Sequence, residues 1–70
     1  MNELQDAFLG ELRDNRIPIT LYLVNGFQYR GTVRDFDKFT VSIEADGQSF
    51  LIFKKMISTV QASRPLSLEF

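Results

Sequence analysis

A turn signal between two runs of alternating residues constrains this chain more than any other feature. Asn25-Gly26 separates Tyr22-Leu23-Val24 from Phe27-Gln28-Tyr29. Asn-Gly is the strongest short-range signal for a β-hairpin, because both turn positions then adopt φ > 0. The sequence therefore predicts two antiparallel strands that meet at this turn. The aromatic rings beside it either pack in the core or offer an exposed face on which a nucleobase can stack.

The chain is too short to bury a large core, so its stability needs a further source. Its 70 residues make one domain at most and include neither cysteine nor histidine. Disulfides, thiolate zinc sites and cysteine catalysis are therefore excluded, and the commonest general base and metal ligand is missing. Oligomerisation remains as the additional source of stability, and we expect no cofactor and no metal.

Catalysis and membrane insertion are also disfavoured. Asp35 and Asp37 lie close together, but aspartates at this spacing are typical of turns, so an enzyme is the weakest function class. No segment approaches the ~18 consecutive apolar residues of a membrane span, and the N-terminus lacks a basic region followed by an apolar run. We expect a cytoplasmic protein with no membrane partner.

The N-terminal segment has the four-residue period of an amphipathic helix. The residues that form its apolar stripe are Leu4, Phe8, Leu9 and Leu12. Asn2 followed by Gln5 resembles a capping box, Asn15 can end the helix, and Pro18 lies shortly beyond. We predict a helix over about residues 4–15, which must pack on a sheet or a partner because it cannot stand alone.

From Ile19 onward the period changes to two, which indicates β-strands. The strands that we predict are Ile19–Val24, Phe27–Arg34, Phe39–Ile43, Gln48–Lys54 and Ile57–Val60. The intervening turns are Asn25-Gly26, Asp35–Lys38, Asp46-Gly47 and Lys55-Met56. Gly31 in the middle of a strand predicts a sharp bend or a bulge of the kind that small barrels need.

These elements predict a mostly β fold with one N-terminal α-helix, in which five short strands form a strongly bent antiparallel sheet, a small open barrel. The domain spans residues 1–62, and residues 63–70 form a short tail in which Leu66, Leu68 and Phe70 alternate. The fourth and fifth strands leave open edges. Phe50–Phe53 is apolar on both faces, which favours an edge that pairs with another subunit.

Several segments in a fixed order carry a family resemblance. They are Leu4-Gln5-Asp6, Phe8-Leu9, Tyr22–Gly26, Gly31, Phe36–Phe39, Phe53–Lys55 and Ile57–Val60. In this order the chain resembles the Hfq family of bacterial Sm-like RNA chaperones, from about Leu4 to Val60. Phe27-Gln28 and the Asp46-Gly47 loop resemble its Gram-positive members. The resemblance implies an Sm-like fold and a six-membered ring that binds small regulatory RNA and messenger RNA and promotes their pairing.

The resemblance implies three RNA-binding surfaces and one subunit interface. A proximal pore site would comprise Gln5, Lys38, Phe39, Lys54 and Lys55 and hold uridine-rich RNA. A distal face would comprise Tyr22, Asn25, Gly26, Phe27, Gln28, Tyr29, Arg30 and Thr59 and hold A-rich RNA. An outer rim would use Arg13 and Arg16. The fourth strand of one subunit would pair with the fifth of the next through Phe50, Leu51, Ile52, Phe53, Ile57, Ser58, Thr59 and Val60.

The net charge of −1 argues against nucleic-acid binding unless the cations gather locally, as three lysines per subunit around a pore would do.

The chain departs from the family pattern at Lys55, where relatives have histidine, and at Phe53, where they have tyrosine. Ser49 and Phe50 stand where relatives often have glutamine. These departures keep open an alternative function, an Sm-fold assembly module with weak or lost RNA binding.

Every predicted site also has a purely structural alternative. Phe39 could belong to the core while the lysines around it form a solvated turn. Tyr22 and Tyr29 could simply cover the sheet. Arg13 and Arg16 could be the solvated face of the helix, with Asp14 between them weakening the local positive field.

Overall fold

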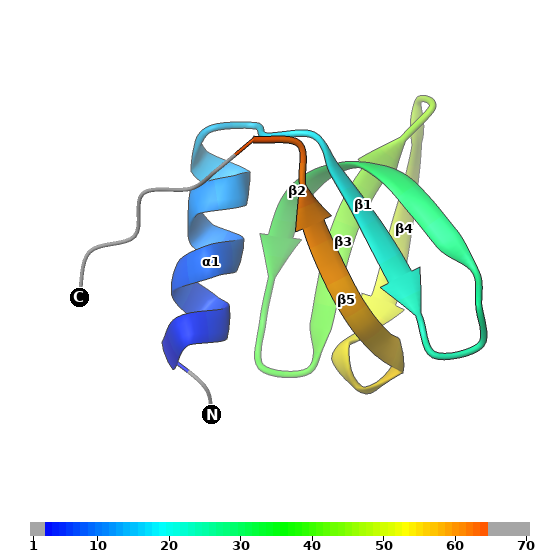
Figure 1. Ribbon diagram of the computed structural model, residues 1–70. Coiled ribbons are helices and arrows are strands. Elements are labelled where there is room, and N and C mark those ends of the chain that lie inside the picture. Colours follow the sequence, from blue (N-terminus) through cyan, green and yellow to red (C-terminus); the bar gives the residue numbers. More distant parts are fainter. Residues whose placement is uncertain (1–2, 65–70) are drawn as a thin grey trace.

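The computed structural model describes residues 3–64, which form one helix and a bent five-stranded antiparallel sheet (Figure 1). The elements are α1 (Glu3–Asp14), β1 (Ile19–Leu23), β2 (Gln28–Phe36), β3 (Thr40–Ala45), β4 (Gln48–Phe53), the 3₁₀-helix η1 (Lys54–Met56) and β5 (Ile57–Ala62). The strand order β4-β3-β2-β1-β5 leaves β4 and β5 at the two open edges. This architecture confirms the predicted fold class. No helix among the described residues is long and apolar enough to cross a membrane.

The end of α1 differs from the prediction in the residue that turns the chain. Arg16, and not Asn15, adopts the left-handed conformation, with φ of 50°. The amide of Ile17 donates back to the carbonyl of Leu12 at 3.1 Å, and both side chains are buried, so the helix ends in a Schellman motif with its apolar contact. The predicted cap Asn2 lies outside the described residues.

The hairpin between β1 and β2 is where the sequence places it, but its turn type was predicted wrongly. Its connection is the four-residue segment Val24–Phe27, in which only Gly26 has a positive φ, 94°. The side-chain oxygen of Asn25 accepts the amide of Phe27 at 3.1 Å, so the asparagine helps through its side chain and not through left-handed backbone. Asp46-Gly47, with φ of 54° and 76°, is the two-residue turn with both residues left-handed.

Gly31 is the point at which the sheet bends. It pairs with Ile19 of β1, whereas the next residue, Thr32, pairs with Glu44 of β3. A Cβ atom on Gly31 would lie only 2.0 Å from the carbonyl oxygen of Glu44, which leaves room for glycine alone. β2 therefore passes from one half of the sheet to the other here, as the bend predicted from its glycine requires.

Most strand boundaries differ by one or two residues from those predicted, and three of these differences have a clear structural cause. β2 continues through Asp35 and Phe36, which were expected in a turn, because a register shift between Val33 and Asp35 lets the strand stay paired with β3. Lys54 opens η1 and does not close the fourth strand. β5 extends two residues further than expected, to Ala62, because it remains paired with β1. The predicted alternation at Leu66, Leu68 and Phe70 lies outside the described residues.

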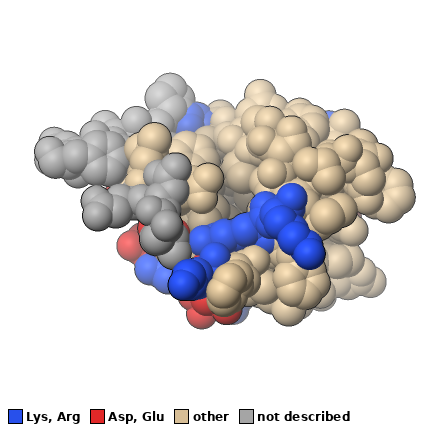
Figure 2. Space-filling view, turned by 90° about the horizontal axis from the view of Figure 1, so that it is seen from below, with Lys and Arg blue, Asp and Glu red and all other residues tan. Residues whose placement is uncertain are grey.

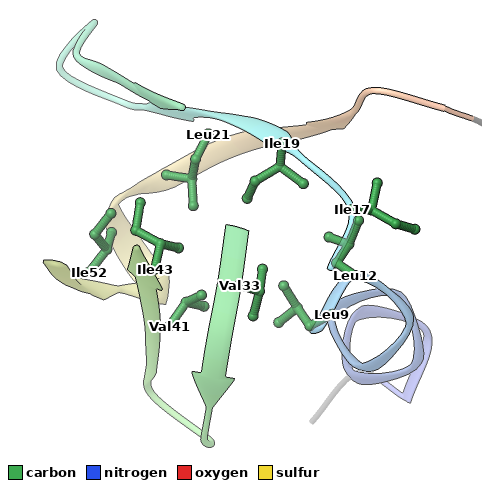
Figure 3. Close-up of a cluster of buried hydrophobic side chains, with 9 residues drawn as sticks. All are labelled: Leu9, Leu12, Ile17, Ile19, Leu21, Val33, Val41, Ile43 and Ile52. Atoms are coloured by element: carbon green, nitrogen blue, oxygen red, sulfur yellow. The ribbon is translucent and has the colours of Figure 1, made fainter. Parts of the chain in front are cut away.

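The core lies between the two halves of the bent sheet and is closed on one side by α1 (Figure 3). Ile19 and Leu21 of β1 lie on one side of it, and Val41 and Ile43 of β3 lie on the other. The buried residues that make up the cluster are Leu9, Leu12, Ile17, Ile19, Leu21, Val33, Val41, Ile43 and Ile52. Only one face of each strand contributes, so the outer face stays available for binding.

Two glycine-to-alanine variants test the bend. Gly31→Ala should lower the free energy of unfolding by about 3 kcal/mol, because the new methyl group meets backbone that cannot move aside. Gly10→Ala in α1 should raise it by about 1 kcal/mol, because the added Cβ meets nothing within 4 Å and alanine favours helix. Urea unfolding at one protein concentration measures both. Equal effects of the two variants would contradict the bend assignment.

Candidate nucleic-acid interface

Two loops bring basic side chains together at one end of the molecule. Lys38 lies in the β2–β3 turn, and Lys54 and Lys55 lie in η1. The amide of Lys54 donates to the carbonyl of Phe39 at 2.7 Å, which fixes η1 against the turn. Figure 2, which looks up at this end, shows basic side chains side by side and acidic ones only at the margin. We call Lys38, Phe39, Lys54 and Lys55 the lysine cluster.

Asp37 holds the turn that carries Lys38 and Phe39. One of its carboxylate oxygens accepts the amides of Phe39 at 2.8 Å and Thr40 at 2.7 Å and the hydroxyl of Thr40 at 2.9 Å. These bonds, the one from Phe39 first, lower the pKa of Asp37 below its ordinary value of 3.8, and the charge of Lys54 lowers it further. The carboxylate therefore stays ionised and keeps the turn closed at neutral pH.

Phe39 is directed to solvent and does not belong to the core. It is 67% exposed, and the Nζ atom of Lys38 lies 5.6 Å from the centre of its ring. Its neighbour along β3, Val41, is fully buried, so the predicted alternation of these two residues on one face is wrong. β3 begins only at Thr40, and the turn before it directs Phe39 outward. An exposed aromatic ring beside a cation can stack a base.

Lys54 differs from the other two lysines because an acidic residue already pairs with it. Its Nζ atom lies 3.3 Å from a carboxylate oxygen of Asp6 in α1 and 5.6 Å from the centre of the Phe36 ring. Its side chain is only 17% exposed. Lys54 also lines, with Gln5, a cavity of about 360 Å³ between α1 and β5. The structure thus brings Gln5 and Lys54 to one cavity, whereas Lys38, Phe39 and Lys55 do not line it.

The register of the sheet sorts the predicted distal residues onto two faces. Tyr22 is opposite Gln28 of β2 and Thr59 of β5, so these three side chains form one row on the outer face. Tyr29 is opposite the fully buried Leu21 and points inward. Its ring packs on Phe50 at 5.0 Å between ring centres. The structure therefore does not place Tyr29 beside Tyr22, and its ring covers the core.

The tip of the β1–β2 hairpin adds exposed apolar surface next to the outer face. Phe27 is 63% exposed, and Val24, which the sequence reasoning did not single out, is exposed to a similar extent. The amide of Val24 donates to the carbonyl of Met56 at 2.8 Å, so η1 supports the tip. Asn25 and Gly26 lie in this supported turn and Arg30 lies on the outer face of β2.

The two predicted rim arginines lie in different surroundings. Arg13 pairs with Asp14 at 3.1 Å and with Asp35 at 3.3 Å, and its guanidinium lies 5.0 Å from the centre of the Phe36 ring. Arg16 is the exposed residue that ends α1 and makes no ion pair with residues 3–64. Phe36 was not predicted at the rim. An apolar residue at position 36 does not by itself indicate a rim site. Only tertiary folding places its ring beside Arg13 of α1.

The open edges carry apolar side chains that no part of the described chain covers. Leu51 and Phe53 on the outer face of β4 are 65% and 55% exposed. Ile52 is buried in the core, so it can contribute to an interface only through its backbone. The remaining predicted interface residues are the partly buried Phe50, Ile57 and Val60 and the exposed Ser58 and Thr59. Among residues 3–64, no group of acidic side chains is arranged to hold a metal ion.

Comparison with known protein families matches this chain to one of them. The family described as "Hfq protein" matches residues 4–67. Among curated proteins, the chain is 56% identical over 64 residues to an RNA-binding protein Hfq of Desulforudis audaxviator, covering 91% of this chain and 77% of that one. It is 52% identical over 66 residues to an RNA-binding protein Hfq of Clostridium botulinum, covering 94% and 78%.

A solved structure gives the same answer for the fold. The chain resembles a crystal structure of "the pleiotropic translational regulator, Hfq" with a TM-score of 0.81 and 36% sequence identity. The superposed region covers 83% of this chain and 97% of the other. The resemblance noted from the motifs is thereby confirmed.

The Asp37 turn makes a pH-dependent contribution to stability. Because the pKa of Asp37 is lowered by folding, its contribution is complete above about 3.8 and is lost as the pH falls through the lowered value. Asp37→Asn should therefore be less stable than the unchanged protein at pH 7, and the difference should shrink below that range. Urea midpoints measured between pH 7 and pH 2 test this. A difference that stays constant with pH would contradict the role of the carboxylate.

Proposed function

This chain belongs to the Hfq family of RNA-binding proteins, and from that premise we propose that it is an RNA chaperone acting as a cytoplasmic ring of six copies. The family is one of RNA-binding proteins and not of enzymes. The observation that carries the proposal is the exposed ring of Phe39 beside Lys38, with Lys54 and Lys55 in the neighbouring η1, on an otherwise mildly acidic chain. This combination suits single-stranded nucleic acid, which offers bases to stack and phosphates to neutralise.

The ring would form by pairing the two open edges of the sheet. β4 of one copy would add to β5 of the next, which satisfies the backbone groups at both edges and leaves none free once the circle closes. Leu51 and Phe53 would lose their exposure to water in this contact. Lys54 and Lys55 directly follow β4, so each joint would bring lysines from neighbouring copies toward one another and build a positive field.

The lysine cluster would hold uridine-rich RNA. Phe39 would stack on one base, an interaction worth about 1–3 kcal/mol. Gln5 and Lys38 would hydrogen-bond the edge of that base, and Lys55 would contact phosphate. Lys54 would reach a phosphate only by exchanging its partner Asp6. Lysine at position 55 binds phosphate but neither stacks nor accepts a hydrogen bond, so selection for uridine would depend on Gln5 and Lys38.

The outer face would hold A-rich RNA. Tyr22 and Phe27 would present the rings between which adenines stack, since both lie on or beside the outer face. Gln28 would read the base edge together with backbone groups of Asn25 and Gly26, and Thr59 would complete the row that contains Tyr22. Tyr29 would support this surface from below through its contact with Phe50.

The two faces together suggest how the ring would act on RNA. Binding one strand on each side raises the local concentration of each for the other, so pairing accelerates without any covalent step. Contacts that are individually weak let strands exchange. The rim would contribute less, because Asp14 and Asp35 pair with Arg13 and leave Arg16 as its remaining cation.

A second function, an assembly module with weak RNA binding, is favoured by one observation. Arg13 and Lys54, two of the predicted RNA ligands, are paired with carboxylates of the same chain. RNA titration separates the two functions. A true binder loses affinity as salt rises, with a slope of about −0.7 in log units per phosphate neutralised, whereas a module without the activity binds neither A-rich nor U-rich strands.

Light scattering tests the ring. The unchanged protein should have six times the mass of one chain, and Leu51→Glu should be monomeric, because it places a charge in the apolar contact between β4 and β5. Val24→Glu is the matched control, an equally exposed apolar residue that belongs to the β1–β2 hairpin and to neither edge strand, and should leave the ring intact. Isolated protomers of the unchanged protein at every ionic strength, with and without oligo-A, would overturn the proposal.

Two further variants test the assignment of the faces. Phe39→Ala should weaken binding of a U-rich oligomer by about tenfold, the value of one stacking interaction, and spare A-rich binding. Tyr22→Ala should do the reverse. Fluorescence anisotropy with labelled oligomers measures both. Equal weakening of both ligands by both variants would refute the two-face assignment.

A further inference from the structure

A second polar row lies next to the row that contains Tyr22 on the outer face. Thr20 of β1 is opposite Arg30 of β2 on one side and Gln61 of β5 on the other. Cross-strand partners lie on the same face, and residues two apart along a strand are about 7 Å apart, so this row adjoins the Tyr22 row. Thr20 and Gln61 belong to none of the surfaces assigned above.

The two rows are joined by a hydrogen bond. The hydroxyl of Tyr22 donates to the side-chain oxygen of Gln61 at 3.0 Å. This bond fixes the Tyr22 ring relative to the second row. Its acceptor, Oε1, is the only oxygen atom of the Gln61 side chain. The amide nitrogen of Gln61 keeps two donors, and no residue from 3 to 64 accepts from them.

Arg30 supplies a charge that the described chain does not neutralise. Arg34, on the same face of β2, is paired with Glu44, and Arg13 is paired with two aspartates. Arg30 makes no ion pair with any residue from 3 to 64. A guanidinium without a carboxylate beside it favours an anion from outside, above all a phosphate, which it can hold through two hydrogen bonds.

The second row borders a hollow large enough for such a group. A pocket of about 350 Å³ is lined by the polar residues Thr20, Arg30, Gln61 and Ser63, and also by Pro18 and Ile19. Ser63 is held in place by the bond from its amide to the carbonyl of Pro18 at 3.0 Å. The polar side chains around the pocket offer a guanidinium, an amide and two hydroxyl groups, which are all donors, and no carboxylate.

We propose that this pocket is a phosphodiester subsite: Arg30 and Gln61 bind the backbone phosphate of a strand whose base stacks on Tyr22. The inference rests on the proposed A-rich face and deepens it by naming the residues that hold the backbone. Gln61 has two roles there. Its oxygen orients the Tyr22 ring, and its amide nitrogen donates to the phosphate, so the base and the phosphate are positioned by one side chain.

Salt-dependent binding of a short A-rich oligomer tests the subsite. Arg30→Gln should weaken binding about tenfold and make the slope of log affinity against log salt shallower by about 0.7, the value for one phosphate that is no longer neutralised. Gln61→Glu keeps an acceptor for Tyr22 but places a negative charge at the phosphate, so it should weaken binding at least as much. Arg34→Gln is the matched control, an arginine of the same strand whose charge Glu44 already neutralises, and should leave the slope unchanged.

A chemically altered ligand distinguishes the subsite from general attraction. With an oligomer whose linkages are neutral methylphosphonates, Arg30→Gln and the unchanged protein should bind equally. An unchanged salt slope in Arg30→Gln, with A-rich binding still dependent on Tyr22, would overturn the subsite and leave the proposed function standing. A-rich binding that does not depend on Tyr22 would instead refute the distal face itself, and the subsite with it.

Discussion

The close approach of β2 and β3 at Gly31 is the constraint on which the rest of this structure depends. With no side chain there, the strand comes within reach of the Glu44 carbonyl and changes partners, so one sheet forms both walls of the core. In this bent sheet, β4 and β5 are the two edge strands. A flat sheet of these strands would not enclose a core between two walls.

Charge pairing within the chain divides its cations into two groups. Arg13, Arg34 and Lys54 pair with carboxylates of neighbouring elements and help to hold the helix and strands together. The other five described cations make no ion pair among residues 3–64, and they are Arg16, Arg30, Lys38, Lys55 and Arg64. Of these, Lys38 lies 5.6 Å from the centre of the exposed Phe39 ring. A protein with almost no net charge can therefore still attract polyanions, because the acidic side chains of the described segment form ion pairs only with the structural cations.

The sequence predicted most of the fold and only part of the site. Alternation and turn signals together predicted every strand, and the glycine in mid-strand predicted the bend. The turn at Asn25 was misjudged because its side chain bonds the backbone of Phe27, an option that composition does not reveal. Tyr29 was grouped with Tyr22 because the family resemblance implies that both belong to the distal face. Register across two strands assigns them to opposite faces.

The sequence by itself determined the order of the elements, the positions of the turns and the lack of cysteine and histidine chemistry, because these follow from local periodicity and composition. Only the tertiary structure decided which polar side chains form hydrogen bonds or ion pairs within the chain. Lys54 meets Asp6 and Tyr22 meets Gln61 across 48 and 39 residues of chain, respectively. Interactions over such separations depend on how a sheet bends and pairs, and no local pattern of residues encodes them.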